Sequence, residues 1–271
     1  MSYKNIVAAG ECCLDLYDGE SVARAGGITF NFAMNAARAF PGKNIHLISA
    51  LGLRDKPLFA EKLDTSGIDY DLTIVRETPS IGINITQNGE REFHSYGSGG
   101  LLDWDLSKSQ RRTIKEADLL ILTRYDAITS LFQRLVKVPT NGMRVVDYAD
   151  ISGKVLSEAK AMLTNHQVAD VCIFGLSPNE GLLRSYLEQL ASDHTGLFVI
   201  TLAHKGAIAI MEGKTWYQPA FPVSEVVDTT GAGDCFAAYF LSHWCSTGNV
   251  KEALEAGCFA ASEVVQKMGA S

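Results

Sequence analysis

The stretch VDTTGAGDCF, residues 227–236, decides how this chain builds its chemistry. Its small residues Gly231, Ala232 and Gly233 precede a run whose apolar side chains recur at helical spacing, which predicts a turn that opens a helix. The start of a helix has unpaired N–H groups and the positive end of a dipole, and glycine lets a phosphate approach them closely. Asp234 brings a carboxylate to the same turn, where it could take a proton from a hydroxyl that attacks phosphorus.

Gly-Ala-Gly-Asp by itself is equally common as a plain loop with an N-cap residue. The longer string DTTGAGDCF is far more specific. It resembles the C-terminal signature of the PfkB/ribokinase family of carbohydrate kinases. The resemblance implies that Asp234 is the catalytic base and that the amides of Gly231, Ala232 and Gly233 form an anion hole. No G-K-[ST] follows the glycines, so the stretch is not a Walker A loop.

The composition is that of a soluble globular protein. The chain has 271 residues, of which 46% are hydrophobic and 20% are charged. A net charge of −7, from 24 basic and 31 acidic residues, argues against a nucleic-acid-binding protein. The length suits one large α/β domain, and the family resemblance predicts a single ribokinase-like kinase domain over residues 1–271.

The six cysteines and the chain start favour a cytoplasmic protein. No C-x-x-C pair occurs, and four cysteines lie in apolar runs, which is typical of small core residues in a reducing compartment. No Cys/His spacing suits a zinc site. The N-terminus lacks a signal-peptide apolar region, and no apolar run approaches the roughly 20 residues of a membrane span. We therefore expect no membrane partner.

The first forty residues carry a second set of polar residues. Residues 6–10 read as a buried strand, and Asp15 follows it at the mouth of the sheet, where ligands bind, unless it is a plain turn residue. Gly26 and Gly27 lead into a helix in which Asn31 is either a ligand or an ordinary polar surface residue. With Asp15 upstream, this G-G-x-x-x-N pattern resembles the family's N-terminal signature. The resemblance implies that Asp15 and Asn31 bind sugar hydroxyls, while Gly26 and Gly27 let the sugar lie against the backbone.

Residues 72–97 alternate apolar and polar side chains, and Asn88-Gly89 is a two-residue hairpin signal. Together with about residues 12–25, they predict a small antiparallel sheet outside the main core. The family has such a lid, which covers the sugar and often pairs with a second subunit. A half-exposed sheet of this size needs a partner for its apolar face, so we expect a homodimer through the lid. Arg91 is predicted to face the substrate, whereas His94 is more typical of a surface strand residue.

Apolar runs at 45–52, 118–123, 144–148, 171–175 and 197–202 alternate with helical segments. This alternation predicts an α/β fold with a central, mostly parallel sheet and helices on both faces. Residues 207–218 add a hairpin around a Glu-Gly-Lys turn. The expected fold class is therefore ribokinase-like, with the small lid as an addition.

The nucleotide side is expected near the carboxyl end of the later strands. TLAHKG, residues 201–206, resembles the family's T-L-G-x-x-G nucleotide loop and implies that Thr201 and Gly206 contact ATP. Ala203 replaces one glycine of that loop. Lys205 either reaches a phosphate or is a solvated lysine. Cys258 occupies the place where many members have an adenine-side asparagine, although a small residue there also suits close helix packing.

The ion sites depart from the family pattern. Asn179 matches the first position of the family's N-x-x-E motif, but the fourth position is Leu182. Glu180 would therefore have to replace the motif's glutamate and contact Mg²⁺ through water. Mg²⁺ is still required to screen the triphosphate charge. Asp228 and Thr230 match residues near a monovalent-cation site in some members, which makes K⁺ a candidate second ion. The family's Asp-x-Asn-x-Arg segment is replaced by residues 147–150, DYAD, with Lys154 beyond.

The predicted function is ATP-dependent phosphorylation of a hydroxymethyl group on a sugar or sugar derivative, with Asp234 as base. Only ten residues separate Asp15 from Gly26, and the chain begins with a C-x-D-x-Y pattern. These features look most like the fructoselysine 6-kinase branch of the family, which implies a fructosamine acceptor. Two alternatives stay open: a nucleoside kinase of the same fold, and a non-catalytic sugar-binding regulator.

Overall fold

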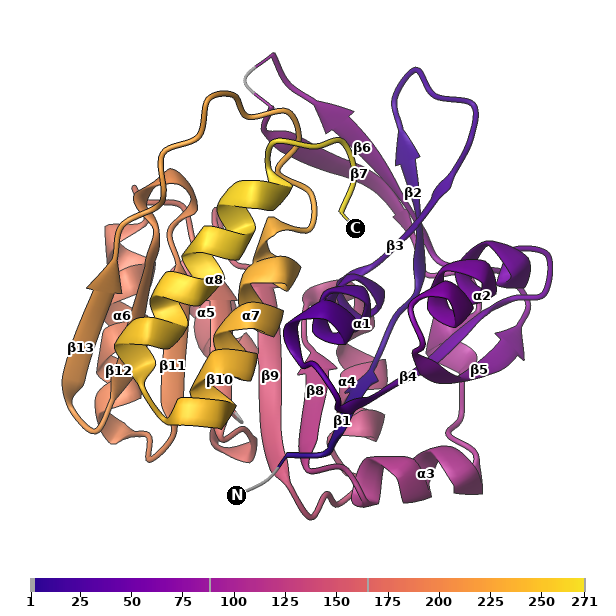
Figure 1. Ribbon diagram of the computed structural model, residues 1–271, viewed down its shortest axis with the longest axis horizontal. Helices are drawn as coiled ribbons and strands as arrows, with labels where there is room; N and C mark the ends of the chain where they lie inside the picture. The colour runs from indigo at the N-terminus through magenta and orange to yellow at the C-terminus, as the bar shows by residue number, and fades with distance from the viewer. Residues whose placement is uncertain (1–2, 88, 165, 271) are drawn as a thin grey trace.

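The computed structural model describes residues 3–87, 89–164 and 166–270. Within those residues nine strands form one large sheet, in the order β13-β12-β11-β10-β9-β8-β1-β4-β5 (Figure 1). Their bounds are β1 Asn5–Ala9, β4 Asn44–Gly52, β5 Asp69–Val75, β8 Leu119–Thr123, β9 Met143–Asp150, β10 Val171–Gly175, β11 Leu197–Thr201, β12 Ala207–Met211 and β13 Lys214–Gln218. Neighbouring strands pair in parallel along the part of this order that runs β11-β10-β9-β8-β1-β4-β5. Strands β12 and β13 add the predicted antiparallel hairpin.

Helices cover both faces of this sheet, as predicted for a ribokinase-like α/β fold (Figure 1). One face carries α1 Ile28–Ala39, α2 Lys56–Thr65, α7 Ala232–Thr247 and α8 Val250–Val264. The other carries α3 Lys108–Lys115, α4 Thr129–Leu135, α5 Leu156–Met162 and α6 Gly181–Asp193. Short 3-10 turns lie at Leu101–Asp103, Asp126–Ile128, His166–Val168 and Ala203–Lys205.

The central strands are apolar on both sides because each side packs against a helical layer. In β1, Ile6 and Ala8 enter the core beneath α1 and α7. Val7 and Ala9 enter the core beneath the opposite helices. All six cysteines are free. None of the helices in the described part of the chain combines the length and hydropathy needed to cross a bilayer.

A second sheet projects beyond the carboxyl ends of the parallel strands (Figure 1). Four strands form it within the described residues, in the order β3-β2-β6-β7. Their bounds are β2 Cys13–Tyr17, β3 Arg24–Gly26, β6 Ser80–Ile85 and β7 Arg91–Gly97. The β6–β7 hairpin is antiparallel, as predicted, although Asn88 of its turn signal lies outside the described residues. The homodimer expected through this sheet stays a prediction.

The small sheet differs from the prediction in two ways. Residues 72–75 were assigned to the lid, but they belong to β5, which pairs in parallel with β4 at the edge of the large sheet. An edge strand is only partly covered, so it mixes apolar and polar residues as a lid strand does. In addition, β2 pairs with β6 in parallel, so the small sheet is mixed rather than antiparallel.

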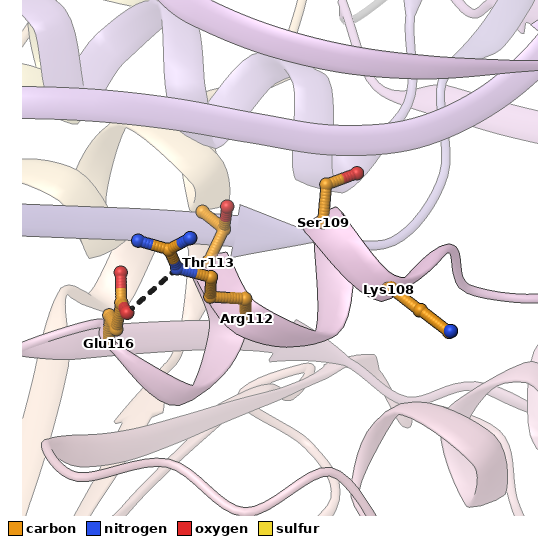
Figure 2. Close-up of a pocket in the computed structure, with 5 residues that line it drawn as sticks. All are labelled: Lys108, Ser109, Arg112, Thr113 and Glu116. Carbon is orange, nitrogen blue, oxygen red and sulfur yellow. Dashed lines mark hydrogen bonds and ion pairs between the residues drawn. The ribbon is translucent and has the colours of Figure 1, made fainter.

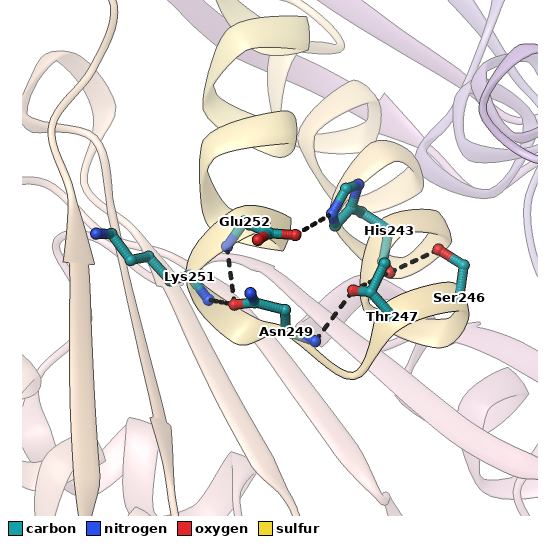
Figure 3. Close-up of polar contacts among 6 residues, drawn as sticks. All are labelled: His243, Ser246, Thr247, Asn249, Lys251 and Glu252. Carbon is teal, nitrogen blue, oxygen red and sulfur yellow. Dashed lines mark hydrogen bonds and ion pairs between the residues drawn. The ribbon is translucent and has the colours of Figure 1, made fainter.

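The corner between α7 and α8 fixes the helix that begins at the Gly231–Gly233 turn. Gly248 ends α7 in a left-handed conformation with a φ of 70°, and its N–H donates to the Trp244 carbonyl. Asn249 then caps α8, because its side-chain oxygen accepts from the Lys251 and Glu252 amides at 3.1 and 3.3 Å (Figure 3). The two helices therefore return side by side, with the start of α7 at the lid end of the molecule (Figure 1).

Candidate active site

The predicted turn before α7 is present and depends on Gly231. This residue is the N-cap of α7 with a φ of 76°, and a β-carbon there would lie 2.5 Å from that of Ala270. Both features favour glycine. At Gly233, in contrast, a β-carbon would meet nothing within 4 Å, so the first turn of α7 faces open space. The N–H groups of a first helical turn lack partners within the helix, so a helix start can bind an anion. Here the Ala232 N–H donates to the Thr229 carbonyl at 3.3 Å, a bond that an anion would replace.

Asp234 and Asn31 meet although 203 residues of chain separate them. The Asn31 side-chain amide donates to Asp234 Oδ2 at 2.9 Å. The contact forms because α1 packs along α7 with both helix starts at the same end of the sheet (Figure 1). Both residues are buried, at 4% and 8% exposure. The two sequence motifs therefore converge in space, as predicted.

The other atom of the Asn31 amide carries a further signal. Its Oδ1 is buried and has no hydrogen-bond partner within the described structure. A buried acceptor left unpaired is costly and uncommon in native proteins. Because it sits beside Asp234, this oxygen is placed to accept a hydrogen bond from a bound hydroxyl or amine.

Asp15 explains one glycine of the Gly26-Gly27 pair. A β-carbon on Gly26 would lie 2.0 Å from Asp15 Oδ2, so the absence of a side chain makes room for that carboxylate. The sequence resemblance assigned this space to the sugar, and in the structure Asp15 fills it. Gly27 has a φ of 98° and lies against the Cys13 backbone, which fixes the turn into α1.

Burial governs the acidity of the site carboxyls. It raises the pKa of Asp234 to about 6, while the Asn31 hydrogen bond and the charge of Arg91 act in the opposite direction. Burial raises the pKa of Asp15 to about 7, and the charges of Glu11 and Asp234 add to that effect. Asp147, in the second half of β9, also has its pKa raised to about 7 by burial and by the charge of Asp234. The raised pKa values bring all three carboxyls into the range where a carboxyl can exchange a proton near neutral pH.

Glu11 belongs to the same group and was not among the predicted site residues. It follows β1 closely, is 4% exposed, and accepts hydrogen bonds from the hydroxyls of Tyr96 and Tyr125. Burial raises its pKa to about 7, with the charge of Asp234 contributing. Its position just after the first strand was a usable signal, since ligands bind beyond the carboxyl ends of parallel strands.

Two residues of the small sheet contact the loop that precedes α7. Arg91 Nη1 donates to the Thr229 carbonyl at 2.9 Å, and the Tyr17 hydroxyl donates to Asp228 Oδ2 at 2.8 Å. Arg91 also acts electrostatically on Asp234. The lid and the turn before α7 are therefore held together, and the predicted position of Arg91 near the site is supported by these contacts.

Asp228 stabilises the loop before α7 through hydrogen bonds to its own carboxylate. Its carboxylate accepts from the amides of Thr230 at 2.8 Å and Gly269 at 2.9 Å, as well as from Tyr17. Burial by itself would raise its pKa, but hydrogen bonding with Thr230, Gly269 and Tyr17 outweighs burial and lowers the pKa. Asp228 is therefore an ionised anchor for the turn before α7. The K⁺ site predicted at Asp228 and Thr230 stays a prediction.

The residues predicted to bind nucleotide lie at the ends of β10 and β11. Asn179 is exposed. Glu180 is the N-cap residue of α6, and its side chain accepts from the Gly153 amide at 2.8 Å. Thr201 donates from its hydroxyl to the Phe174 carbonyl. Across the described residues, no three His, Cys, Asp or Glu side chains converge in a way that could hold a metal ion.

The remaining nucleotide-side residues flank the β12–β13 hairpin. Lys205 is exposed. Gly206 has a φ of 97°, and a β-carbon on it would lie 2.0 Å from the Gln218 carbonyl oxygen, so this glycine is required by the hairpin itself. Cys258 is 6% exposed, with its sulfur 4.0 Å from the same carbonyl. Packing thus accounts for Gly206 and Cys258, and their contacts with ATP stay predictions.

Two residues that differ from the family pattern have a left-handed backbone conformation. Ala203, which replaces a family glycine, has a φ of 45°. Ala149, at the asparagine position of Asp-x-Asn-x-Arg, has a φ of 56°. Glycine and asparagine tolerate this conformation better than alanine does. Both alanines therefore hold a backbone conformation that costs some strain.

A hollow of about 460 Å³ lies on α3, far from these residues, and contains none of the predicted site residues. Figure 2 shows its lining: Lys108, Ser109, Arg112, Thr113 and Glu116. Arg112 pairs with Glu116 at 3.0 Å on an exposed surface. Such a pair contributes little, and this face is best explained as a solvated helix surface.

Comparison with known proteins decides the family. A sequence profile of the pfkB family of carbohydrate kinases matches residues 6–271. The chain belongs to the pfkB family. It is 25% identical to fructoselysine 6-kinase of Escherichia coli (strain K12) over 273 residues, which cover 98% of this chain and 99% of that protein. As a member of this family, the protein is an ATP-dependent sugar or nucleoside kinase.

Solved structures of pfkB-type kinases share the fold. Ribokinase from Cryptococcus neoformans var. grubii serotype A, in complex with ADP, is similar with a TM-score of 0.77 and 22% identity, covering 99% of this chain and 96% of that one. Adenosine kinase from Sinorhizobium meliloti has a TM-score of 0.79 and 17% identity, with 99% and 95% covered. At these identities the likeness shows the fold alone. The ribokinase-like prediction is confirmed.

Proposed function

We propose that this pfkB kinase transfers the γ-phosphoryl group of ATP to a hydroxymethyl group of a sugar derivative, with Asp234 as the general base. The observation that carries the proposal is the buried Asn31–Asp234 contact with Asn31 Oδ1 left unpaired beside it. An acceptor hydroxyl that donates to Asp234 would lie next to the open first turn of α7. Proton removal and stabilisation of phosphoryl charge would then occur at adjacent positions.

Asp15 and Asn31 would orient the acceptor, because a carboxylate and an amide together accept from and donate to neighbouring hydroxyls. The amides of Gly231, Ala232 and Gly233 would face the transferred group. Mg²⁺, when bound with ATP, neutralises phosphate charge. The described residues offer no three-ligand cluster, which suits an ion held mainly by phosphates and water.

The acceptor we favour is a fructosamine, a ketose carrying an amine-linked substituent. Two features support this choice. The chain matches the Escherichia coli fructoselysine 6-kinase over nearly the full length of both proteins, and the β2–β3 segment of the lid is short. Phe93 of β7, half exposed at 52%, pairs with Ile83 on the face of the small sheet that carries Tyr17. A bulky substituent could rest on the exposed part of Phe93, since Ile83 and Tyr17 are themselves buried.

A coupled ADP-release assay over ketoses, aldoses, fructosamines and nucleosides tests the proposal. We expect sugar-dependent ATP turnover, with a fructosamine giving the highest kcat/KM. Plain ribose or fructose far exceeding every fructosamine would reject the acceptor, and adenosine or inosine exceeding all sugars would make the protein a nucleoside kinase. Sugar binding without ATP turnover on any acceptor would instead identify a regulator.

A further inference from the structure

Arg124 is a buried cation that the proposed phosphoryl transfer does not use. It follows β8 directly, at the carboxyl end of the parallel strands, and its backbone N–H donates to the Asp147 carbonyl at 2.7 Å. The residue is 8% exposed, and its Nη1 is buried without a hydrogen-bond partner. Asp126 Oδ1 lies 3.8 Å from Nη1, which is too far for a hydrogen bond. Arg124 therefore lacks the hydrogen-bonded partner that a buried charge needs.

Two half-buried arginines show what a structural arginine does in this chain. Arg134 donates to two backbone carbonyls, at 2.8 and 3.2 Å. Arg144 donates to two others, each at 3.1 Å. The more deeply buried Arg124 side chain donates to no carbonyl among the described residues, and its guanidinium lies over the Phe132 ring, 5.9 Å from the centroid. Its hydrogen-bonding capacity is therefore left for a ligand.

A second cation reaches the same place from another loop. Lys154, beyond β9, pairs with Asp126, and its side chain is only 18% exposed. Asp126, whose side chain is 66% exposed, is thus shared by two cations that are both better buried. The carboxylates of Asp150 and Glu180 accept from backbone amides instead, at 2.9 and 2.8 Å. Two cations and one anion leave Arg124, Lys154 and Asp126 with one positive charge to spare, and the anion is the most exposed of the three.

The position of Arg124 indicates which ligand it would meet. Phe132 belongs to α4, which covers the face of the sheet opposite to α7, so the guanidinium lies apart from Asp234 (Figure 1). The hydroxyl of the next residue, Tyr125, donates to Tyr96 of the small sheet at 3.2 Å, which places the end of β8 under the lid. The residues predicted to bind nucleotide lie farther along the sheet, at the ends of β10 and β11. An anion bound here would therefore be a distant part of the acceptor.

We propose that Arg124 and Lys154 form a subsite that binds a carboxylate carried by the acceptor. The inference rests on the proposed function and deepens it, because it favours fructosamines formed from amino acids over those formed from simple amines. The hydroxymethyl end would lie at Asp234 and the carboxylate at Arg124, whose planar guanidinium can donate two parallel hydrogen bonds to it. An uncharged substituent would leave that guanidinium without a partner.

Isothermal titration calorimetry without ATP tests the subsite separately from catalysis. Three probes are the fructosamines of glycine, 4-aminobutanoate and 6-aminohexanoate, each compared with its carboxamide, which differs in the charge of that group. A fourth comparison, gluconate with glucitol, places the carboxylate on the sugar itself. We expect at least one fructosamine carboxylate to bind to the wild-type protein roughly tenfold to a hundredfold more tightly than its amide.

Matched variants locate the preference. Arg124→Met, which keeps an unbranched side chain and removes the charge, should bring the carboxylate-to-amide ratio close to one. Lys154→Met should lower the ratio by a smaller factor, at least threefold. Arg54→Met removes an arginine beyond β4 whose side chain is 89% exposed, and it should leave the ratio unchanged.

Equal binding within all four comparisons, or an unchanged ratio in Arg124→Met, would overturn the subsite. If circular dichroism shows that Arg124→Met does not fold, the threefold loss in Lys154→Met decides in its place. A preference confined to gluconate would uphold the subsite and reject a fructosamine as the acceptor. A preference among the fructosamines with no phosphorylated product from any sugar would uphold the subsite and reject the proposed function.

Discussion

The acceptor end and the nucleotide end of the candidate site are built differently. At the acceptor end, Asp15, Asn31 and Asp234 are buried, and Asn31 and Asp234 are already hydrogen-bonded to each other. At the nucleotide end, Asn179 and Lys205 are exposed. A hydroxyl must be oriented to within a fraction of an ångström for reaction, which requires preorganised side chains. A triphosphate can be bound largely by backbone amides and its own metal ion, so it demands less of the side chains.

The largest expected effect is at the acceptor end. Asp234→Asn should fold normally and lose at least roughly a thousandfold in kcat, because proton removal and acceptor orientation both depend on the carboxylate. Asp193→Asn, an exposed residue at the end of α6, is the matched control and should keep wild-type turnover. Near-wild-type turnover of Asp234→Asn in the coupled assay would remove the proposed mechanism.

The Gly26→Ala variant tests whether Asp15 orients the acceptor, without changing the carboxylate that removes the proton. The new β-carbon would overlap the Asp15 carboxylate and force it to move. We expect the KM for the acceptor to rise tenfold or more, with the KM for ATP unchanged, since small displacements of orienting groups cost this much. Gly97→Ala in the same sheet, where a β-carbon makes only an ordinary contact at 3.5 Å, serves as control. An unchanged acceptor KM would show that Asp15 does not orient the substrate.

The acceptor end should also make stability depend on pH. Glu11, Asp15, Asp147 and Asp234 have pKa values raised to about 6 or 7 in the folded protein. Between about pH 4 and 7 the folded state therefore holds protons that the unfolded state has released, so the free energy of unfolding falls as pH rises. Asp228, with its lowered pKa, acts in the opposite sense and loses its contribution only at acidic pH.

Differential scanning calorimetry of the ligand-free protein measures this pH dependence of stability. We expect Tm to fall by several degrees from about pH 5 to pH 7.5, and the fall to be smaller in Asp234→Asn. A Tm that rises across this range would mean that these carboxyls are stabilised in their charged forms, contrary to their burial.

The smallest effects are expected at the nucleotide end. Lys205→Ala and Asn179→Ala should each raise the KM for ATP by less than about fivefold, because exposed polar side chains contribute little to binding. The acceptor KM should not change. A hundredfold loss of ATP affinity in either variant would show that the nucleotide end is as dependent on side chains as the acceptor end.

Prediction from sequence worked where local pattern and chemistry agree. The glycines at 231 and 233 predicted a turn that opens a helix, and the structure has that turn. The convergence of Asn31 with Asp234 came from a family resemblance, since no local pattern can bring together residues 203 positions apart.

Other features were hidden from the sequence for physical reasons. Residues 72–75 of β5 lie at the edge of the large sheet, where they are only partly covered, so their composition resembles that of a lid strand. Glu11 was missed because its tyrosine partners lie 85 and 114 residues away along the chain. The role of Gly26 was assigned to the sugar because nothing in the sequence shows that Asp15 fills the space.

The central claim is that one bound acceptor touches both ends of the chain, at Asn31 and at residue 234. A crystal structure of the Asp234→Asn variant with a fructosamine and a non-hydrolysable ATP analogue tests this most directly. We predict the hydroxymethyl oxygen within hydrogen-bond distance, about 3 Å, of the residue 234 side chain and of Asn31, facing the first turn of α7. An acceptor bound on another surface, or with this oxygen turned away from α7, would contradict the account.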